Sequence, residues 1–186
     1  MPTRIKICGI TRIEDALAAA HLGTDAIGLV FWPQSARSIT PAKAREIVAT
    51  LPPFISSVGV YVDPEAEWVE ETVAVAGLNL LQFHGDESPE FCSQFSLPYI
   101  KAVRVRAGVD LLQYATRYSS ARGLLLDSYV EGTPGGTGDA FNWSLIPQCL
   151  SLPLILSGGL HPGNVTAAIK QVQPWAVDVS SGVEVA

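Results

Sequence analysis

Two side chains at the ends of apolar runs could carry reaction chemistry. Cys8 closes the stretch RIKIC, and Lys6 lies on the same face because alternate strand residues point the same way. A nearby ammonium lowers the pKa of a thiol and favours the thiolate, although a free cysteine is equally often a small buried hydrophobe. Asp127 ends the run LLLD, where a carboxylate must be paired, solvated or catalytic. A functional role is favoured for Asp127 and remains open for Cys8.

Two further polar residues follow other apolar runs. His84 ends LLQFH, with Gln82 beside it on the same face, and a lone histidine is more often a hydrogen-bonding residue than a catalyst. Arg37 lies in the loop WPQSARSI, where an arginine is usually solvated but can also fork onto a carboxylate. Both are candidates for binding rather than for catalysis.

Glycine-rich turns follow the last apolar runs. SGGLHPGNV and SSGV stand where backbone N–H groups bind phosphate in barrels of parallel strands. The stretch EGTPGGTGDAF, after Asp127, lacks the standard phosphate-loop patterns. We expect it to form a mobile lid or to allow close approach of a ligand.

These positions depend on an alternation of apolar runs with helix-like segments. Eight such runs and seven intervening segments predict repeated βα units, and the near-continuous apolar content of the runs indicates strands covered on both faces. We therefore expect an α/β fold, a (βα)8 TIM barrel in a single domain over 1–186 that lacks the final C-terminal helix. The expected strands are 4–8, 25–31, 55–63, 78–84, 98–104, 121–127, 152–158 and 175–180, and the expected helices 13–23, 40–51, 64–77, 88–96, 109–118, 141–150 and 162–172.

Composition narrows the choice of partners. The chain has 186 residues, 48% of them hydrophobic and 16% charged, with a net charge of −6 and no basic run. Nucleic acid and acidic membrane surfaces are not expected as partners, whereas small anions remain possible. Cys8, Cys92 and Cys149 fit neither a disulfide framework nor a zinc site, and no run has transmembrane length. A cytoplasmic protein without a metal is expected.

Several motifs, taken in order along the chain, resemble those of the phosphoribosylanthranilate isomerase family. They are KICGIT, the arginine loop at 37, QFHGDE, LLLDS with the following GGTG, LSGGLHPGNV and VDVSSGVE. The resemblance implies an isomerase of tryptophan biosynthesis. It would convert N-(5-phosphoribosyl)anthranilate to 1-(2-carboxyphenylamino)-1-deoxyribulose 5-phosphate by an Amadori rearrangement. The family implies no cofactor, a phosphosugar-anthranilate substrate, and a monomer or homodimer.

The resemblance also implies a division of roles. Asp127 would be the general acid that opens the sugar ring and must hold its proton near neutral pH, and Cys8 the general base, assisted by Lys6. Arg37 would bind the anthranilate carboxylate, and His84 and Asp178 would support the site, Asp178 by neutralising Lys6. The phosphate would bind at the turns that contain Gly158, Gly159, Ser181 and Gly182.

Other functions remain open at this stage. The related isomerase of histidine synthesis would be expected to carry an aspartate in place of Cys8, and a pentose-phosphate epimerase would bring metal-binding residues at several strand ends. A non-catalytic barrel that binds a phosphometabolite would retain affinity without turnover. A cysteine-nucleophile hydrolase would need a histidine paired with Cys8, and no histidine is placed for that by the sequence.

Overall fold

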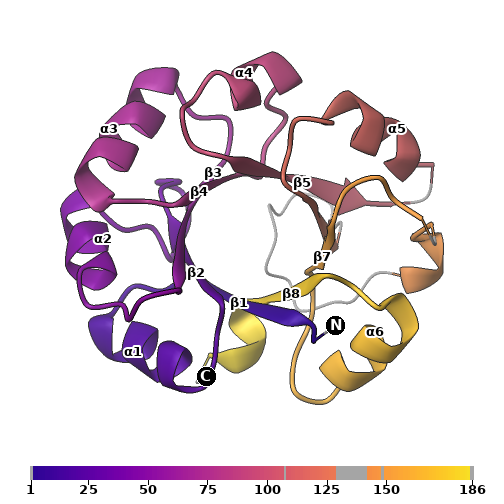
Figure 1. The fold of residues 1–186 in the computed structure, drawn as a ribbon, viewed down its shortest axis with the longest axis horizontal. Coiled ribbons are helices and arrows are strands. Elements are labelled where there is room, and N and C mark those ends of the chain that lie inside the picture. Colours follow the sequence, from indigo (N-terminus) through magenta and orange to yellow (C-terminus); the bar gives the residue numbers. More distant parts are fainter. Residues whose placement is uncertain (1, 107, 129–141, 148, 185–186) are drawn as a thin grey trace.

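Eight parallel strands close into a barrel in the order in which they occur along the chain. The computed structural model describes residues 2–106, 108–128, 142–147 and 149–184. Figure 1 looks along the barrel and shows the strands as a ring. The closed sheet confirms the expected (βα)8 fold. The strands are β1 Arg4–Cys8, β2 Ala26–Val30, β3 Ser56–Tyr61, β4 Leu80–Phe83, β5 Tyr99–Val105, β6 Leu124–Ser128, β7 Leu154–Leu156 and β8 Ala176–Val179.

The helices form an outer layer around the strands (Figure 1). Two of them begin with a capped proline: Thr40 caps α2 before Pro41, and Ser88 caps α4 before Pro89. The α-helices are α1 Ile13–His21, α2 Pro41–Val48, α3 Ala66–Ala76, α4 Pro89–Ser93, α5 Leu111–Arg117 and α6 Val165–Val172, with 3₁₀ turns η1 at Trp143–Leu145 and η2 at Ser181–Val183. None of the helices in the described ranges is long and apolar enough to cross a membrane.

The expected helix over 141–150 is wrong for the residues described there. They hold only η1, a single 3₁₀ turn that is capped by Asn142. Ile146 leaves this turn with an extended backbone, φ −82° and ψ 121°. The next residue is Pro147, and the residue before a proline is disfavoured in the α region. The proline therefore stops the helix that the apolar spacing suggested.

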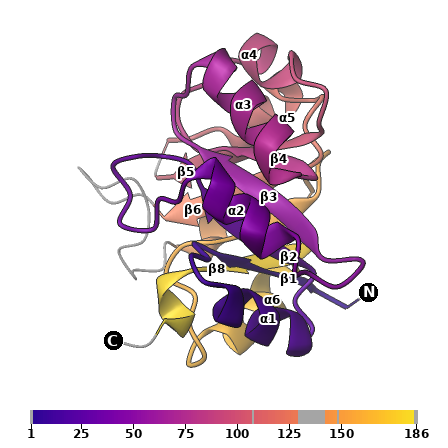
Figure 2. The same ribbon diagram turned by 90° about the vertical axis from the view of Figure 1, so that its left-hand side faces the viewer.

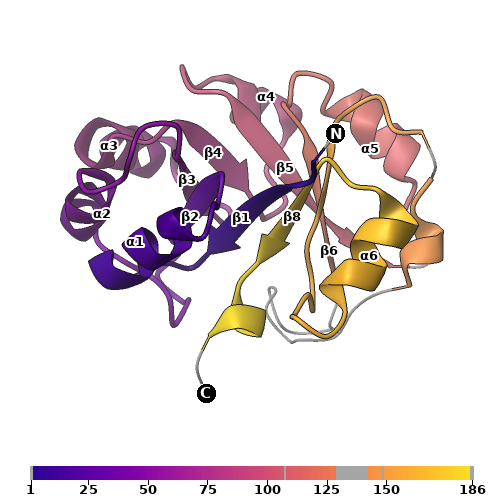
Figure 3. The same cartoon turned by 60° about the horizontal axis from the view of Figure 1, so that its bottom comes forward.

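Apolar side chains fill two separate spaces. The larger cluster packs between the outside of the strands and the helices and includes Ile27, Leu81, Phe83 and Leu126. A small cluster fills the barrel interior at the amino-terminal half of the strands, formed by Leu80, Ile100, Ala102, Leu125, Ile155 and Ala176. Towards the strands' carboxyl ends the inward-facing positions change from apolar to polar, for example from Leu125 to Asp127. Figures 2 and 3 show this end from the side, with the yellow turn η2 beyond the arrowhead of β8.

Candidate active site

One pocket opens at the carboxyl ends of the strands, and the residues assigned to the site from sequence all line it. Cys8 comes from β1 and Asp127 from β6, while the other members lie on the neighbouring strand ends and turns. The remaining assigned residues in its lining are Arg37, His84, Gly158, Gly159, Asp178, Ser181 and Gly182. The parallel barrel therefore brings together side chains that are up to 174 positions apart (8 to 182).

A buried ion pair lies beneath Cys8. The Nζ of Lys6 donates to Oδ1 of Asp178 at 2.8 Å, and the two side chains are only 6% and 5% exposed. The strands β1 and β8 place them side by side, since Lys6 is the register partner of Asp178. Burial alone lowers the pKa of Lys6, but the Asp178 carboxylate and the Cys8 sulfur outweigh it, so that the pKa is raised. The expected neutralisation of Lys6 by Asp178 is confirmed.

Lys6 lowers the pKa of Cys8 as expected, but burial outweighs this effect, so Cys8 is not a low-pKa thiol. Burial raises the pKa of the Cys8 thiol, and the ammonium of Lys6 lowers it only in part. The carboxylate of Asp178 pushes the pKa up further. Because the Lys6 ammonium is paired with Asp178, both charges act on the thiol, and the carboxylate cancels part of the effect of the ammonium. In the resting site the proton is therefore held on sulfur more firmly than in a free cysteine.

Asp127 is held from two sides. Its Oδ1 accepts the backbone N–H of Ser128 at 2.9 Å, and its Oδ2 lies 3.0 Å from Nε2 of His84. His84 in turn contacts the amide nitrogen of Gln82 through Nδ1, also at 3.0 Å. Gly158, at φ +83°, completes the enclosure, because a Cβ there would lie 2.8 Å from Oδ1 of Asp127. The structure thus joins His84 to Asp127, a contact that sequence reasoning did not predict.

Arg37 has a partner that the sequence analysis missed. Its guanidinium forms a two-pronged contact with Glu184, with Nη2 2.7 Å from Oε2 and Nε bonded to Oε1. Hydrogen bonding to this carboxylate raises the pKa of Arg37 and lowers that of Glu184. Gly9, at φ +87°, is the residue over which the side chain passes: a Cβ at this position would overlap Cδ of Arg37. The glycine at this position therefore allows the close approach of the Arg37 side chain.

The turns after β7 and β8 lie against each other at the pocket wall. A Cβ on Gly182 would overlap the carbonyl of Leu160, so the two turns touch through their backbones. No described atom accepts a hydrogen bond from the backbone N–H of Gly159 or of Gly182. Such free N–H groups in tight turns suit an anion. The stretch EGTPGGTGDAF was expected to form a mobile lid or to allow close approach of a ligand. It lies outside the described residues.

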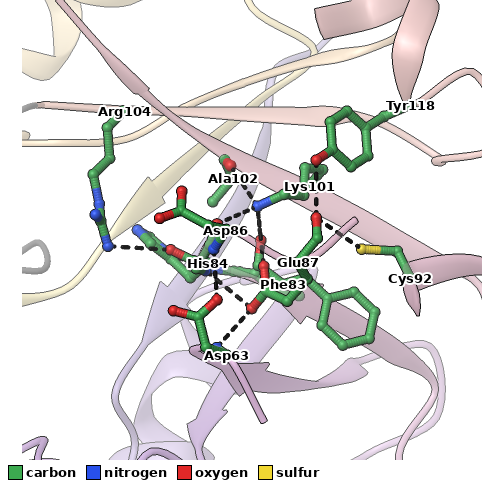
Figure 4. Close-up of polar contacts among 12 residues, drawn as sticks. Asp63, Phe83, His84, Asp86, Glu87, Cys92, Lys101, Ala102, Arg104 and Tyr118 are labelled. Carbon is green, nitrogen blue, oxygen red and sulfur yellow. Dashed lines mark hydrogen bonds and ion pairs between the residues drawn. The ribbon is translucent and has the colours of Figure 1, made fainter. Parts of the chain in front are cut away.

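A second buried ion pair lies behind His84 (Figure 4). Lys101 on β5 contacts Oε2 of Glu87 at 3.1 Å, and both side chains are 2% exposed. The lysine also donates to the carbonyls of Phe83 at 3.2 Å and of Gly85 at 2.7 Å, which flank His84 in the chain. Oε1 of Glu87 accepts from the N–H of Gly85 at 3.0 Å. This network fixes the backbone on either side of His84 and was not foreseen from the sequence.

Comparison with known proteins identifies close relatives. The family model described as N-(5'phosphoribosyl)anthranilate (PRA) isomerase matches residues 5–186. The N-(5'-phosphoribosyl)anthranilate isomerases of Nitrosospira multiformis and Nitrosomonas europaea are 75% and 67% identical over the whole chain, which spans 89% and 88% of their lengths.

Solved structures agree. The crystal structure of phosphoribosyl anthranilate isomerase from Thermotoga maritima superposes with a TM-score of 0.91 at 43% identity, covering 100% of this chain and 91% of the other. A phosphoribosyl anthranilate isomerase in complex with reduced 1-(o-carboxyphenylamino)-1-deoxyribulose 5-phosphate gives a TM-score of 0.88 at 42% identity, covering 100% and 90%.

Proposed function

The chain belongs to the N-(5'-phosphoribosyl)anthranilate isomerase family, and from this premise we propose how its residues divide the reaction. The enzyme converts N-(5-phosphoribosyl)anthranilate to 1-(2-carboxyphenylamino)-1-deoxyribulose 5-phosphate in tryptophan biosynthesis. This Amadori rearrangement opens a furanose ring and then moves a proton away from C2 of the sugar. It requires an acid for the ring oxygen and a base for the carbon-bound proton.

Asp127 is the proposed acid and Cys8 the proposed base. The observation that carries this assignment is that the two side chains come from different strands, β6 and β1, and line one pocket. Asp127 gives its proton to the ring oxygen, the bond between C1 and that oxygen breaks, and the nitrogen lone pair forms the protonated Schiff base at C1. Cys8 then removes the proton from C2, and the resulting enolamine tautomerises to the ketone.

The raised pKa of Cys8 suits a base that binds its proton tightly. Its pKa is raised by burial, so its thiolate is scarce in the resting enzyme but strongly basic once formed. Lys6 offsets part of the cost of forming that thiolate. The cationic Schiff base makes the C2 proton acidic at the same step, which reduces the demand on the base.

Binding is assigned to the rim of the pocket. Arg37 is proposed to hold the anthranilate carboxylate, because a guanidinium fork matches a carboxylate and already holds one in Glu184. The free N–H groups of Gly159 and Gly182, with Gly158 and Ser181 beside them, are proposed to hold the sugar phosphate. This placement puts the two anionic ends of the substrate at different turns, with the ribose over Cys8 and Asp127.

Turnover of freshly generated phosphoribosylanthranilate, followed by its fluorescence, tests these roles. Cys8→Ala and Asp127→Asn should each lower kcat by roughly a hundredfold to ten-thousandfold, the usual value of a general acid or base. Matched controls are Cys149→Ala and Asp15→Asn, which change an exposed thiol and a carboxylate on α1. Activity in either site variant close to that of its control would overturn the assignment.

A second copy of the chain is the proposed partner. One related structure is of mutually generated monomers of dimeric phosphoribosylanthranilate isomerase from Thermotoga maritima, 40% identical with a TM-score of 0.84. In this chain the loops at the amino ends of the strands expose Leu22, Phe54 and Trp175, and Phe54 is fully exposed. Apolar groups gathered at one end of a barrel favour self-association. Light scattering should give the mass of a dimer, and Phe54→Glu should give that of a monomer.

We place the reaction in the cytoplasm. A thiol base works only while reduced, and the three cysteines of the chain, Cys8, Cys92 and Cys149, are all free. Fractionation of cells that express the protein, followed by assay of each fraction, tests this placement.

A further inference from the structure

Gln82 lines the pocket, but its neighbours on the adjacent strands are apolar. Its register neighbours are Val60 on β3 and Ile100 on β5, and the residue two positions before it on the same strand face is Leu80. Only 1% of Gln82 is exposed. A leucine or methionine would fill this position without removing an amide from water. Packing therefore does not explain why an amide side chain occupies this position.

The nitrogen and the oxygen of the Gln82 amide differ in their hydrogen-bond partners. Nε2 lies 3.0 Å from Nδ1 of His84, whereas Oε1 is buried and has no hydrogen-bond partner among the described residues. A buried acceptor without a partner weakens a fold, and such groups gather where function requires them. The contact with His84 is thus the one polar interaction for which the side chain of Gln82 is held in place.

This contact determines where His84 carries its proton. An amide nitrogen can only donate, so Nδ1 of His84 must accept, and a neutral imidazole then carries its hydrogen on Nε2. Nε2 lies 3.0 Å from Oδ2 of Asp127, so the ring donates to the carboxyl group. Arg104 on β5 donates to the backbone carbonyl of His84 at 3.4 Å, and among the described residues it has no hydrogen bond to the imidazole. The tautomer of His84 therefore follows from Gln82.

The opposite tautomer would interfere with the acid. With its hydrogen on Nδ1, the ring would present a lone pair at Nε2 towards Asp127. A protonated Asp127 would then donate to His84 instead of to the ring oxygen of the substrate. With Nε2–H in place, the ring cannot take that proton, and the Asp127 proton has the substrate as its acceptor.

We propose that Gln82 is a positioning residue that holds His84 as its Nε2–H tautomer, so that the imidazole does not compete with the substrate for the proton of Asp127. The proposal rests on the proposed role of Asp127 as the acid. It gives Gln82 a role that acts through His84 and not through direct contact with the substrate.

Gln82→Glu is the decisive variant, because it replaces the donor by an acceptor of the same shape. A carboxylate at this position takes a hydrogen bond from Nδ1, so His84 either moves its hydrogen to Nδ1 or binds a second proton. In both states Asp127 no longer carries a proton for the substrate, and kcat should fall roughly a hundredfold. Affinity for the reduced product analogue that binds a related enzyme should stay within about threefold, since a change that removes only transition-state stabilisation leaves ground-state binding intact.

Two further variants separate positioning from packing. Gln82→Met removes the donor and the unpaired acceptor together, so kcat should fall about tenfold while the melting temperature holds or rises. Gln94→Glu places the same new charge on an exposed residue after α4 and should leave kcat unchanged. Wild-type kcat in Gln82→Glu would overturn the proposal, because it would mean that the amide oxygen faces His84.

Nitrogen NMR of the imidazole rings provides a readout that does not depend on activity. The chain has three histidines, and His84 is assigned by its loss in His84→Asn. Wild-type His84 should show hydrogen on Nε2 and none on Nδ1, and Gln82→Glu should change that pattern. A wild-type ring with its hydrogen on Nδ1 contradicts the proposal outright. If Asp127→Asn proved active, the proposed acid would fall while the tautomer measurement would still stand or fall by itself.

Discussion

Two lysine–carboxylate pairs are buried in the described part of this barrel, one on either side of the strand layer. Lys6 and Asp178 meet inside the barrel at 2.8 Å, directly below the pocket. Lys101 and Glu87 meet outside it at 3.1 Å, between β5 and the helices, where Lys101 also lies over the ring of Tyr118 (Figure 4). The charges and the depth of burial are nearly the same, but the neighbours differ.

The neighbours determine what each lysine does. Besides Glu87, Lys101 donates to the carbonyls of Phe83, Gly85 and Ala102, so its charge is taken up by fixed backbone dipoles. Lys6 has a single carboxylate and the sulfur of Cys8 beside it, so its charge still acts on the proposed base.

A buried pair on its own is weak evidence for stability, since desolvation opposes the attraction between the charges. The comparison indicates that the outer pair fixes the chain around His84, whereas the inner pair adjusts the energy of the Cys8 thiolate. The following measurements test that contrast.

Breaking the inner pair should have the largest effect on activity. Lys6→Met removes the cation that favours the Cys8 thiolate and leaves the Asp178 carboxylate, which disfavours it. We expect kcat/KM to fall at least about a hundredfold. We also expect a stability loss of about 3–5 kcal/mol from the unpaired buried charge. Turnover and urea unfolding measure the two quantities. An activity loss no larger than that of Lys101→Met would remove the contrast.

Breaking the outer pair should mainly affect stability. Lys101→Met leaves Glu87 buried without its cation, which should cost about 3–5 kcal/mol in the free energy of unfolding. The folded fraction should keep kcat within about tenfold of wild type, because no charge that faces the pocket has changed. Lys43→Met, at an exposed pair with Glu46, is the control and should cost no more than about 1 kcal/mol.

The double variant Glu87→Leu/Lys101→Met checks the cause. It removes both charges, so most of the lost stability should return even though the hydrogen bonds to the backbone around His84 do not. A double variant as unstable as Lys101→Met would show that the backbone contacts, and not the unpaired charge, set the cost.

Alkylation of Cys8 tests the direction of its pKa. Because burial raises that pKa, the thiolate is scarce near neutral pH, and the rate of reaction with iodoacetamide should keep rising beyond the pH at which a free thiol, with a pKa of about 8.5, has levelled off. Lys6→Met should slow the reaction several-fold at a given pH. Peptide mapping separates Cys8 from exposed Cys149 and from Cys92, whose pKa burial raises to about 12.

The same shift makes stability depend on pH. A thiol whose pKa is higher in the folded than in the unfolded chain contributes stability that is fully present below the unfolded pKa. That contribution is lost as the pH rises through the folded value. Cys8→Ser should therefore reduce the loss of stability at alkaline pH. Alkylation of Cys8 as fast as that of Cys149 near neutral pH would contradict a raised pKa of Cys8.

Much of the fold and the membership of the site follow from sequence, because both depend on local pattern. Eight apolar runs separated by helix signals require parallel strands, and parallel strands bring their carboxyl ends together. Cys8 and Asp127 were found at such ends. The Lys6–Asp178 pair was also expected, since a lysine inside an apolar barrel requires a carboxylate.

What the sequence did not provide are quantities that depend on depth and on long-range neighbours. The net pKa shift of Cys8 is a balance between burial and a paired charge, and only coordinates give its sign. Glu87 and Lys101 read as an ordinary loop acid and a strand lysine until the barrel places them in contact. The helix expected after β6 failed at Pro147, where a local backbone restriction outweighed apolar spacing.

A third ion pair, between Arg37 and Glu184, is partly exposed to solvent. Changing it should have the smallest effect on activity. The two side chains are 29% and 46% exposed, so water screens their attraction. Glu184 nevertheless places a negative charge on the guanidinium proposed to hold the anthranilate carboxylate. Glu184→Gln keeps a hydrogen-bonding side chain while removing that charge, and we expect KM to fall about two- to fivefold with kcat unchanged.

Salt and a matched variant sharpen this last test. The gain in Glu184→Gln should be largest at low ionic strength and should shrink as salt screens the substrate carboxylate. Arg37→Met should raise KM and abolish the effect of the second change, because Glu184 acts on the substrate only through Arg37. A higher KM in Glu184→Gln would instead show that Glu184 orients Arg37 more than it competes with the substrate. At this edge of the pocket the position of Arg37 would then matter more than the charge beside it. For Lys6 inside the barrel we expect the opposite.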